Sequence, residues 1–192
     1  HDDDTVDKVK LVTDLGACIS EFPVTLEAAQ EARRLGMHTI MGAPNTLRGA
    51  SHSGNLSAID AIEAEAVDVL ASDYHPGSLL HAALALTDTG RLPLHEAAKL
   101  ISQNPAATVG LHDRGSIKIG QAADIVLVEM AEPALTRAPA RARVRATLRR
   151  GEPIYSDVYM ARLSDNVSHT AFHPMTVDRL MDKVLDPQAV NN

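Results

Sequence analysis

Asp73 is the acidic residue whose position in the chain most favours chemistry. It closely follows a buried-type apolar run at residues 67–70, which predicts a strand of a parallel sheet. In parallel barrels, reactive groups lie where strands end, because side chains from several strands converge there on one accessible point. A carboxylate beside a buried strand needs a cation or hydrogen-bond donors. A metal ion, a lysine or arginine partner, and a helix N-terminus are therefore all open interpretations of Asp73.

A polar, glycine-containing loop predicted at residues 42–55 carries side chains that suit an anion. Its candidate donors are Arg48, Ser51, His52, Ser53 and Asn55. A planar guanidinium beside hydroxyl, imidazole and amide groups can hold several phosphate oxygens at once. We therefore expect this loop to bind phosphate groups of a substrate.

Helical and apolar strand-like stretches alternate along residues 1–108 and must position these groups. The predicted helices cover residues 5–15, 25–35, 58–66, 79–86 and 93–102, and the predicted strands cover residues 17–20, 37–41 and 67–70. This alternation predicts an α/β fold with a parallel sheet.

Residues 109–156 change character and predict a small separate sheet. The expected strands are residues 117–119, 124–128, 141–148 and 153–155. Arg141, Arg143 and Arg145 alternate with Ala142 and Val144, a period of two that is typical of an exposed strand face. Residues 157–192 form a tail with helical spacing of its apolar residues.

Composition limits the classes of partner. The chain has 192 residues, a formal net charge of −7 and a pI near 5.7, so it lacks the surplus of Lys and Arg that nucleic acid or an anionic membrane would require. No apolar run approaches the length of a membrane span, and the single cysteine, Cys18, is interpreted as a reduced core residue. These features predict a cytoplasmic protein with a small-molecule partner.

Several motifs together resemble known sequences. Residues 102–106 (SQNPA), 109–111 (VGL), 113–117 (DRGSI) and 123–126 (ADIV) are similar to the closing segment of the amidohydrolase superfamily. More narrowly, residues 19–25 (ISEFPVT), 41–45 (MGAPN), 49–55 (GASHSGN) and 71–74 (ASDY) resemble the PhnM family of phosphonate metabolism. That family consists of α-D-ribose 1-methylphosphonate 5-triphosphate diphosphatases.

The resemblance implies a fold and a chemistry. Residues 1–108 would form the C-terminal half of a (β/α)8 metal-dependent hydrolase barrel, and residues 109–156 would form a small β-sandwich segment. His1 would be a metal ligand, and Asp73 would both contact the metal and accept the proton of the attacking water. The substrate would be a ribose triphosphate phosphonate, cleaved to its 5-phosphate and pyrophosphate, and the metal would be divalent, with zinc expected.

One part of the superfamily pattern is missing, which keeps other interpretations open. The printed sequence contains no His-x-His pair, and a zinc site generally takes four ligands, of which His1 and Asp73 supply two. We therefore expect an incomplete metal site, a missing N-terminal half and a chain that pairs with that half or with itself. The alternatives are a dihydroorotase-like cyclic-amide hydrolase and a catalytically silent fragment that packs with another chain.

Overall fold

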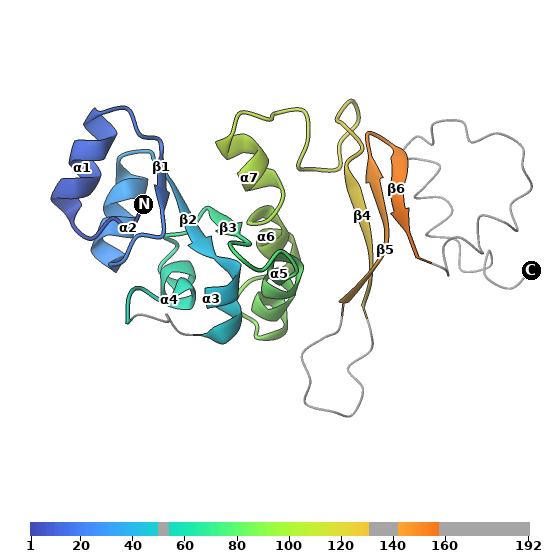
Figure 1. Ribbon diagram of the computed structural model, residues 1–192, viewed down its shortest axis with the longest axis horizontal. Coiled ribbons are helices and arrows are strands. Elements are labelled where there is room, and N and C mark those ends of the chain that lie inside the picture. The colour runs from blue at the N-terminus through green and yellow to red at the C-terminus, as the bar shows by residue number, and fades with distance from the viewer. Residues whose placement is uncertain (50–53, 131–141, 158–192) are drawn as a thin grey trace, which may run out of the picture. The chain divides into compact units, whose positions relative to one another are not determined.

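The computed structural model describes residues 1–49, 54–130 and 142–157 (Figure 1). These residues divide into two compact units, the first covering residues 1–115 and the second residues 116–130 and 142–157. The first unit combines helices with a sheet, and the second contains only strands and loops. The mixed α/β content agrees with the prediction from the alternating sequence pattern.

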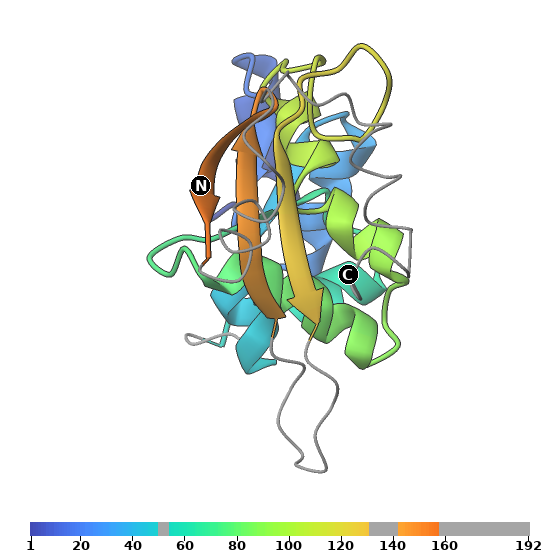
Figure 2. The same cartoon turned by 90° about the vertical axis from the view of Figure 1, so that its right-hand side faces the viewer.

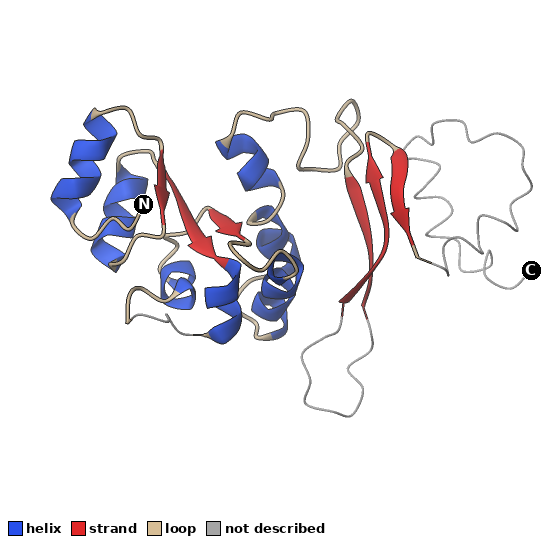
Figure 3. Cartoon of the chain, in the orientation of Figure 1, coloured by secondary structure: helices blue, strands red, loops and turns tan. Residues whose placement is uncertain are grey.

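A three-stranded parallel sheet organises the first unit (Figure 3). Its strands are β1 (Ile19–Glu21), β2 (His38–Gly42) and β3 (Val69–Ala71), in that spatial order. Both pairings are parallel, and Ile40 of β2 is the partner of Glu21 on one side and of Val69 on the other. Because all three strands run in one direction, their carboxyl ends meet at one edge of the sheet.

Helices connect these strands and follow them. They are α1 (Val6–Asp14), α2 (Leu26–Arg34), α3 (Ala43–Arg48), α4 (Ala58–Glu63), α5 (Ser78–Asp88), α6 (Leu94–Lys99) and α7 (Gln103–Thr108). Thr5, Thr25 and Ser57 cap α1, α2 and α4, each accepting a hydrogen bond from the first helical turn. None of the helices in the described ranges is long and apolar enough to cross a membrane.

Helix α3 corrects the predicted loop at residues 42–55. Pro44 lies in the first turn of α3, where its missing N–H costs nothing, and Ala43, Pro44 and Thr46 are buried. Gly42 caps the start of the helix, and Gly49 ends it with φ +73°. Helix α7 lies beyond the predicted helices, the last of which ends at residue 102, and Pro105 lies in its first turn, where a missing N–H is tolerated.

The core of the first unit is built mainly from small residues. Leu70 and Leu86 are fully buried among alanines such as Ala43, Ala61 and Ala83, which let helices pack closely on the sheet.

The prediction that Cys18 is a core residue is wrong, because the side chain is exposed. Strand β1 begins one residue later, at Ile19, so Cys18 lies in the connection before the sheet.

A buried hydrogen bond fixes the start of the chain against β1. The Ser20 hydroxyl, which is fully buried, donates to Asp3 Oδ2 at 2.6 Å, and Asp3 is only 2% exposed. Lys8 Nζ lies 3.9 Å from the other carboxylate oxygen. Residues 1–3 are thereby held beside the carboxyl end of β1.

We expect Ser20→Ala to lower the free energy of unfolding by about 1–3 kcal/mol, because it leaves the buried Asp3 carboxylate without its closest donor. Chemical denaturation measures this loss. Ser102→Ala removes an exposed hydroxyl and serves as the control, expected to change stability by less than about 0.5 kcal/mol. Equal effects of the two substitutions would contradict the role of the buried bond.

The second unit is a three-stranded antiparallel sheet (Figure 2). Its strands are β4 (Ile125–Met130), β5 (Ala142–Arg149) and β6 (Glu152–Ser156), in sequential order. Arg150 and Gly151, both with positive φ, form the tight turn between β5 and β6. The strand predicted at residues 117–119 is wrong: these residues pair with no strand in the described ranges, and Ile119 is 98% exposed.

The arginines of β5 follow the predicted alternation only in part. Arg143 is exposed as expected, but the Arg145 side chain is only 18% exposed and bonds to both Asp157 and Glu129. The hydrogen bond to the buried Asp157 carboxylate raises the pKa of Arg145 above its usual range. Arg145 therefore belongs to an ion-pair network of the sheet, and Arg141 lies outside the described residues.

Candidate functional site

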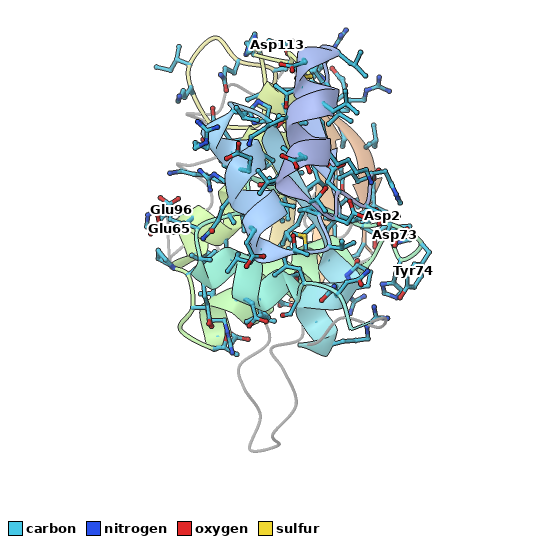
Figure 4. All side chains as sticks on the ribbon, turned by 90° about the vertical axis from the view of Figure 1, so that its left-hand side faces the viewer. Asp2, Glu65, Asp73, Tyr74, Glu96 and Asp113 are labelled. Atoms are coloured by element: carbon cyan, nitrogen blue, oxygen red, sulfur yellow. The ribbon has the colours of Figure 1, made fainter. Side chains whose placement is uncertain are left out.

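A pocket of about 280 Å³ lies at the carboxyl edge of the parallel sheet. Residues that follow each of the three strands line it, as expected where parallel strands end together. Its apolar lining includes Phe22, Val24, Met41, Pro44 and Leu56, and its polar lining includes Asp2, Asn45, Arg48, Asn55, Asp73 and Tyr74. Figure 4 shows Asp2, Asp73 and Tyr74 gathered on one side of this unit, away from Glu65 and Glu96.

Unusual backbone conformations concentrate at this pocket. Five residues other than glycine have positive φ in the described part of the chain, and three of them line the pocket. These are Asp2, Phe22 and Asp73, with φ of 54°, 55° and 51°. Left-handed backbone costs free energy in such residues and is common at functional sites, where it directs a side chain.

Asp73 is exposed, which corrects the expectation that it needs a partner to offset burial. Within the described ranges it forms no ion pair, and the N-cap of α5 is Gly77, so neither structural interpretation of Asp73 is realised there. The turn that carries it is nevertheless fixed. His75 N–H donates to Ser72 O at 3.0 Å, and the buried Ser78 hydroxyl donates to His75 O at 2.6 Å.

His1 contacts residues of the pocket lining. Its ring meets Phe22 edge to face, with centroids 5.9 Å apart, and its Nδ1 lies 2.6 Å from Asp2 Oδ2. Its Nε2 lies 3.9 Å from Glu21 Oε2. His1 thus contacts two residues that line the same pocket as Asp73.

The described residues do not fit a metal centre. Over residues 1–49, 54–130 and 142–157, no three His, Cys, Asp or Glu side chains are grouped closely enough to hold a metal ion. Both nitrogens of the His1 ring instead face carboxylates of its own neighbourhood. The described residues therefore add no third ligand to the expected pair, His1 and Asp73.

The predicted phosphate donors divide between described and undescribed residues. Arg48, in the last turn of α3, and Asn55 both line the pocket. Arg48 Nη1 donates to Tyr74 Oη at 2.8 Å. Ser51, His52 and Ser53 lie outside the described residues.

Asp2, Phe22 and Tyr74 line the pocket but were not among the predicted site residues. Phe22 and Tyr74 stand in segments that carry the family resemblance, at residues 19–25 and 71–74, and Asp2 follows His1, the metal ligand that the resemblance implies. That position was an available signal for them. Their orientation was not, because it depends on backbone angles that residue types alone do not reveal.

Comparison with known proteins identifies the class of protein. A family model described as the amidohydrolase family matches residues 8–155, and the chain belongs to this family. The chain is also 47% identical, over 129 residues, to the alpha-D-ribose 1-methylphosphonate 5-triphosphate diphosphatase of Escherichia coli (strain K12). These two matches confirm the predicted resemblance to PhnM-like amidohydrolases. The second covers 66% of this chain and 34% of the relative, so the chain spans about a third of that relative's length.

Solved structures agree on the fold. A D-hydantoinase is similar with a TM-score of 0.57 and 16% identity, over 79% of this chain and 48% of its own. A prolidase complexed with N-methylphosphonate-L-proline is similar with a TM-score of 0.58 and 19% identity. This match covers 80% of this chain and 44% of the prolidase chain. At these identities the likeness shows an amidohydrolase fold. The amidohydrolase superfamily is generally metal-dependent.

Proposed function

We propose that this chain carries the phosphate-binding and proton-accepting side of a cytoplasmic PhnM-like hydrolase. The reaction would convert α-D-ribose 1-methylphosphonate 5-triphosphate into its 5-phosphate and pyrophosphate. One observation carries the proposal: Asp73 and Arg48, from different strand–helix connections, line one pocket at the carboxyl edge of the sheet. The identity to the diphosphatase supports the choice of substrate.

In the proposed reaction, water attacks the phosphorus next to the ribose. The bond from this phosphorus to the bridging oxygen breaks, and pyrophosphate leaves with that oxygen. Asp73 takes a proton from the attacking water, a role suited to a carboxylate that no cation neutralises within the described ranges.

Phosphate binding is assigned to the predicted donors. Arg48 and Asn55 would hold phosphate oxygens through their N–H groups, and Ser51, His52 and Ser53 are proposed for the same role from their residue types. The apolar lining, which includes Phe22 and Met41, offers the less polar parts of the substrate an apolar surface.

The proposed reaction assigns no step to a metal ion. Zinc, the expected metal, generally takes four ligands, and over the described ranges no three His, Cys, Asp or Glu side chains are grouped to hold a metal ion. Further ligands from a second polypeptide, either an N-terminal half or another copy of this chain, are part of the proposal.

The proposed fold follows the same relationship. Residues 1–108 would contribute the C-terminal part of a (β/α)8 barrel, residues 109–156 a composite β domain, and residues 157–192 an additional tail. The parallel order β1-β2-β3, with a helical connection between successive strands, supports the barrel assignment.

The substrate assignment is tested by reconstituting the chain with the proposed N-terminal half, supplying zinc and the ribose triphosphate phosphonate, and recording phosphorus NMR spectra. Pyrophosphate and the ribose 5-phosphate are the expected products. Orthophosphate as the sole new product, or cleavage of dihydroorotate in its place, would reject the substrate. Absence of any reaction would reject catalysis by this chain and favour the silent fragment.

We expect Arg48→Met to weaken binding of inorganic triphosphate by about 10- to 100-fold, because hydrogen bonds from a cation to phosphate are among the stronger polar contacts. Calorimetric titration measures the affinity. Arg91→Met is the matched control, since Arg91 pairs with Glu63 and does not line the pocket. Equal affinities of the two variants would remove Arg48 from the site.

A further inference from the structure

The contact between Arg48 and Tyr74 joins two separate connections at the pocket. Arg48 ends α3, which follows β2, whereas Tyr74 lies in the turn after β3. The guanidinium Nη1 donates to the phenol oxygen at 2.8 Å, and both residues line the pocket.

Arg48 differs from the other arginines of this unit. Arg33, Arg34, Arg91 and Arg114 each lie within 4.0 Å of a carboxylate oxygen. No such ion pair involves Arg48 within the ranges that the structure describes, and its contact there is a neutral phenol. Its positive charge therefore remains available to an anion in the pocket.

Tyr74 contributes little to the core, which argues against a purely structural role. Its side chain is 68% exposed, although burial is the usual source of stability from an aromatic ring. An exposed hydrogen bond between two long side chains adds little to folding, because ordering both side chains costs conformational entropy.

The hydrogen bond from Arg48 also determines whether the phenol can donate or accept a further hydrogen bond. A phenol oxygen that accepts from Arg48 keeps its own O–H as a donor. Polarisation by the cation strengthens that donor. A guanidinium with further N–H groups and a phenol O–H thus form a joint donor set for phosphate oxygens.

Resting on the proposed function of this pocket, we propose that Tyr74 is a specificity-determining residue for the polyphosphate group. It holds the Arg48 guanidinium in place and donates its own proton to a phosphate oxygen. The left-handed backbone of Asp73, with φ 51°, precedes Tyr74 in the turn that brings this ring to Arg48.

The test compares Tyr74→Phe with the full wild-type chain by calorimetric titration of inorganic triphosphate. We expect about 2- to 10-fold weaker binding, with an unchanged melting temperature. In the hydrolysis assay, KM should rise by a similar factor while kcat stays within about twofold. Tyr155→Phe, an exposed tyrosine of β6 in the other unit, is the matched control and should change neither value.

A second variant separates the two roles of Tyr74. In an Arg48→Met background, Tyr74→Phe should cost less than in the wild type, because the guanidinium it positions is gone. Wild-type affinity in Tyr74→Phe, or a lowered melting temperature that accounts for weaker binding, would overturn the inference. Failure of the wild-type chain to bind triphosphate would overturn the phosphate-binding function itself, a distinguishable result.

Discussion

Asp73→Asn should reduce pyrophosphate release by about 10²- to 10⁴-fold, the usual contribution of a positioned proton acceptor. The amide matches the carboxylate in shape but cannot take the proton of the attacking water. Asparagine also tolerates the left-handed backbone at this position, where φ is 51°, so the turn is expected to persist. The rate of pyrophosphate formation under saturating substrate measures the effect.

Two comparisons make this result specific. Binding of inorganic triphosphate to Asp73→Asn should be at least as tight as to the wild type, because a negative charge is removed from the pocket. Asp88→Asn changes an exposed aspartate at the end of α5 and should leave the rate unchanged. A full rate in Asp73→Asn would show that the proton goes elsewhere.

Gly115→Ala is expected to have the largest effect on stability, lowering the free energy of unfolding by about 2–5 kcal/mol. Gly115 has φ +89°, and a Cβ there would lie 2.9 Å from both Gln103 Cα and Ser102 O. Both are backbone atoms at the start of α7, so no side chain can rotate away to relieve the contact. Denaturant titration measures the loss.

Gly110→Ala separates the two causes of that loss. Gly110 has a similar φ, +75°, but no atom lies within 4 Å of a Cβ placed there. Its substitution should cost only the left-handed backbone, about 1–2 kcal/mol. Equal losses in the two variants would show that the close approach of residue 115 to α7 does not contribute to the loss of unfolding free energy in Gly115→Ala.

The helical and strand elements were largely predictable because local patterns dominate them. The helices predicted at residues 5–15 and 25–35 match α1 and α2, and the predicted strands lie within two residues of β1, β2 and β3. Helix α3 was missed because its buried face is Ala43, Pro44 and Thr46, which carry no strong helical pattern. Its burial depends on packing against distant segments.

The amidohydrolase class could also be predicted from the sequence, because some motif positions accept only one residue type for reasons of packing. The glycine of the DRGSI segment illustrates this: only glycine fits where residue 115 meets the start of α7. Asp73 and Arg48 could be proposed for a site from their place after strands and their charge.

What the sequence determined by itself was the class, the order of elements and the residue types able to bind phosphate. Tertiary structure alone decided that Asp2, Phe22, Arg48, Asp73 and Tyr74 line one pocket, and that Arg48 meets Tyr74 across 26 positions of sequence. The physical reason is that local patterns report on backbone preference and burial. Which side chains meet depends on parallel strands ending at a common edge and on left-handed turns that aim the residues beyond them.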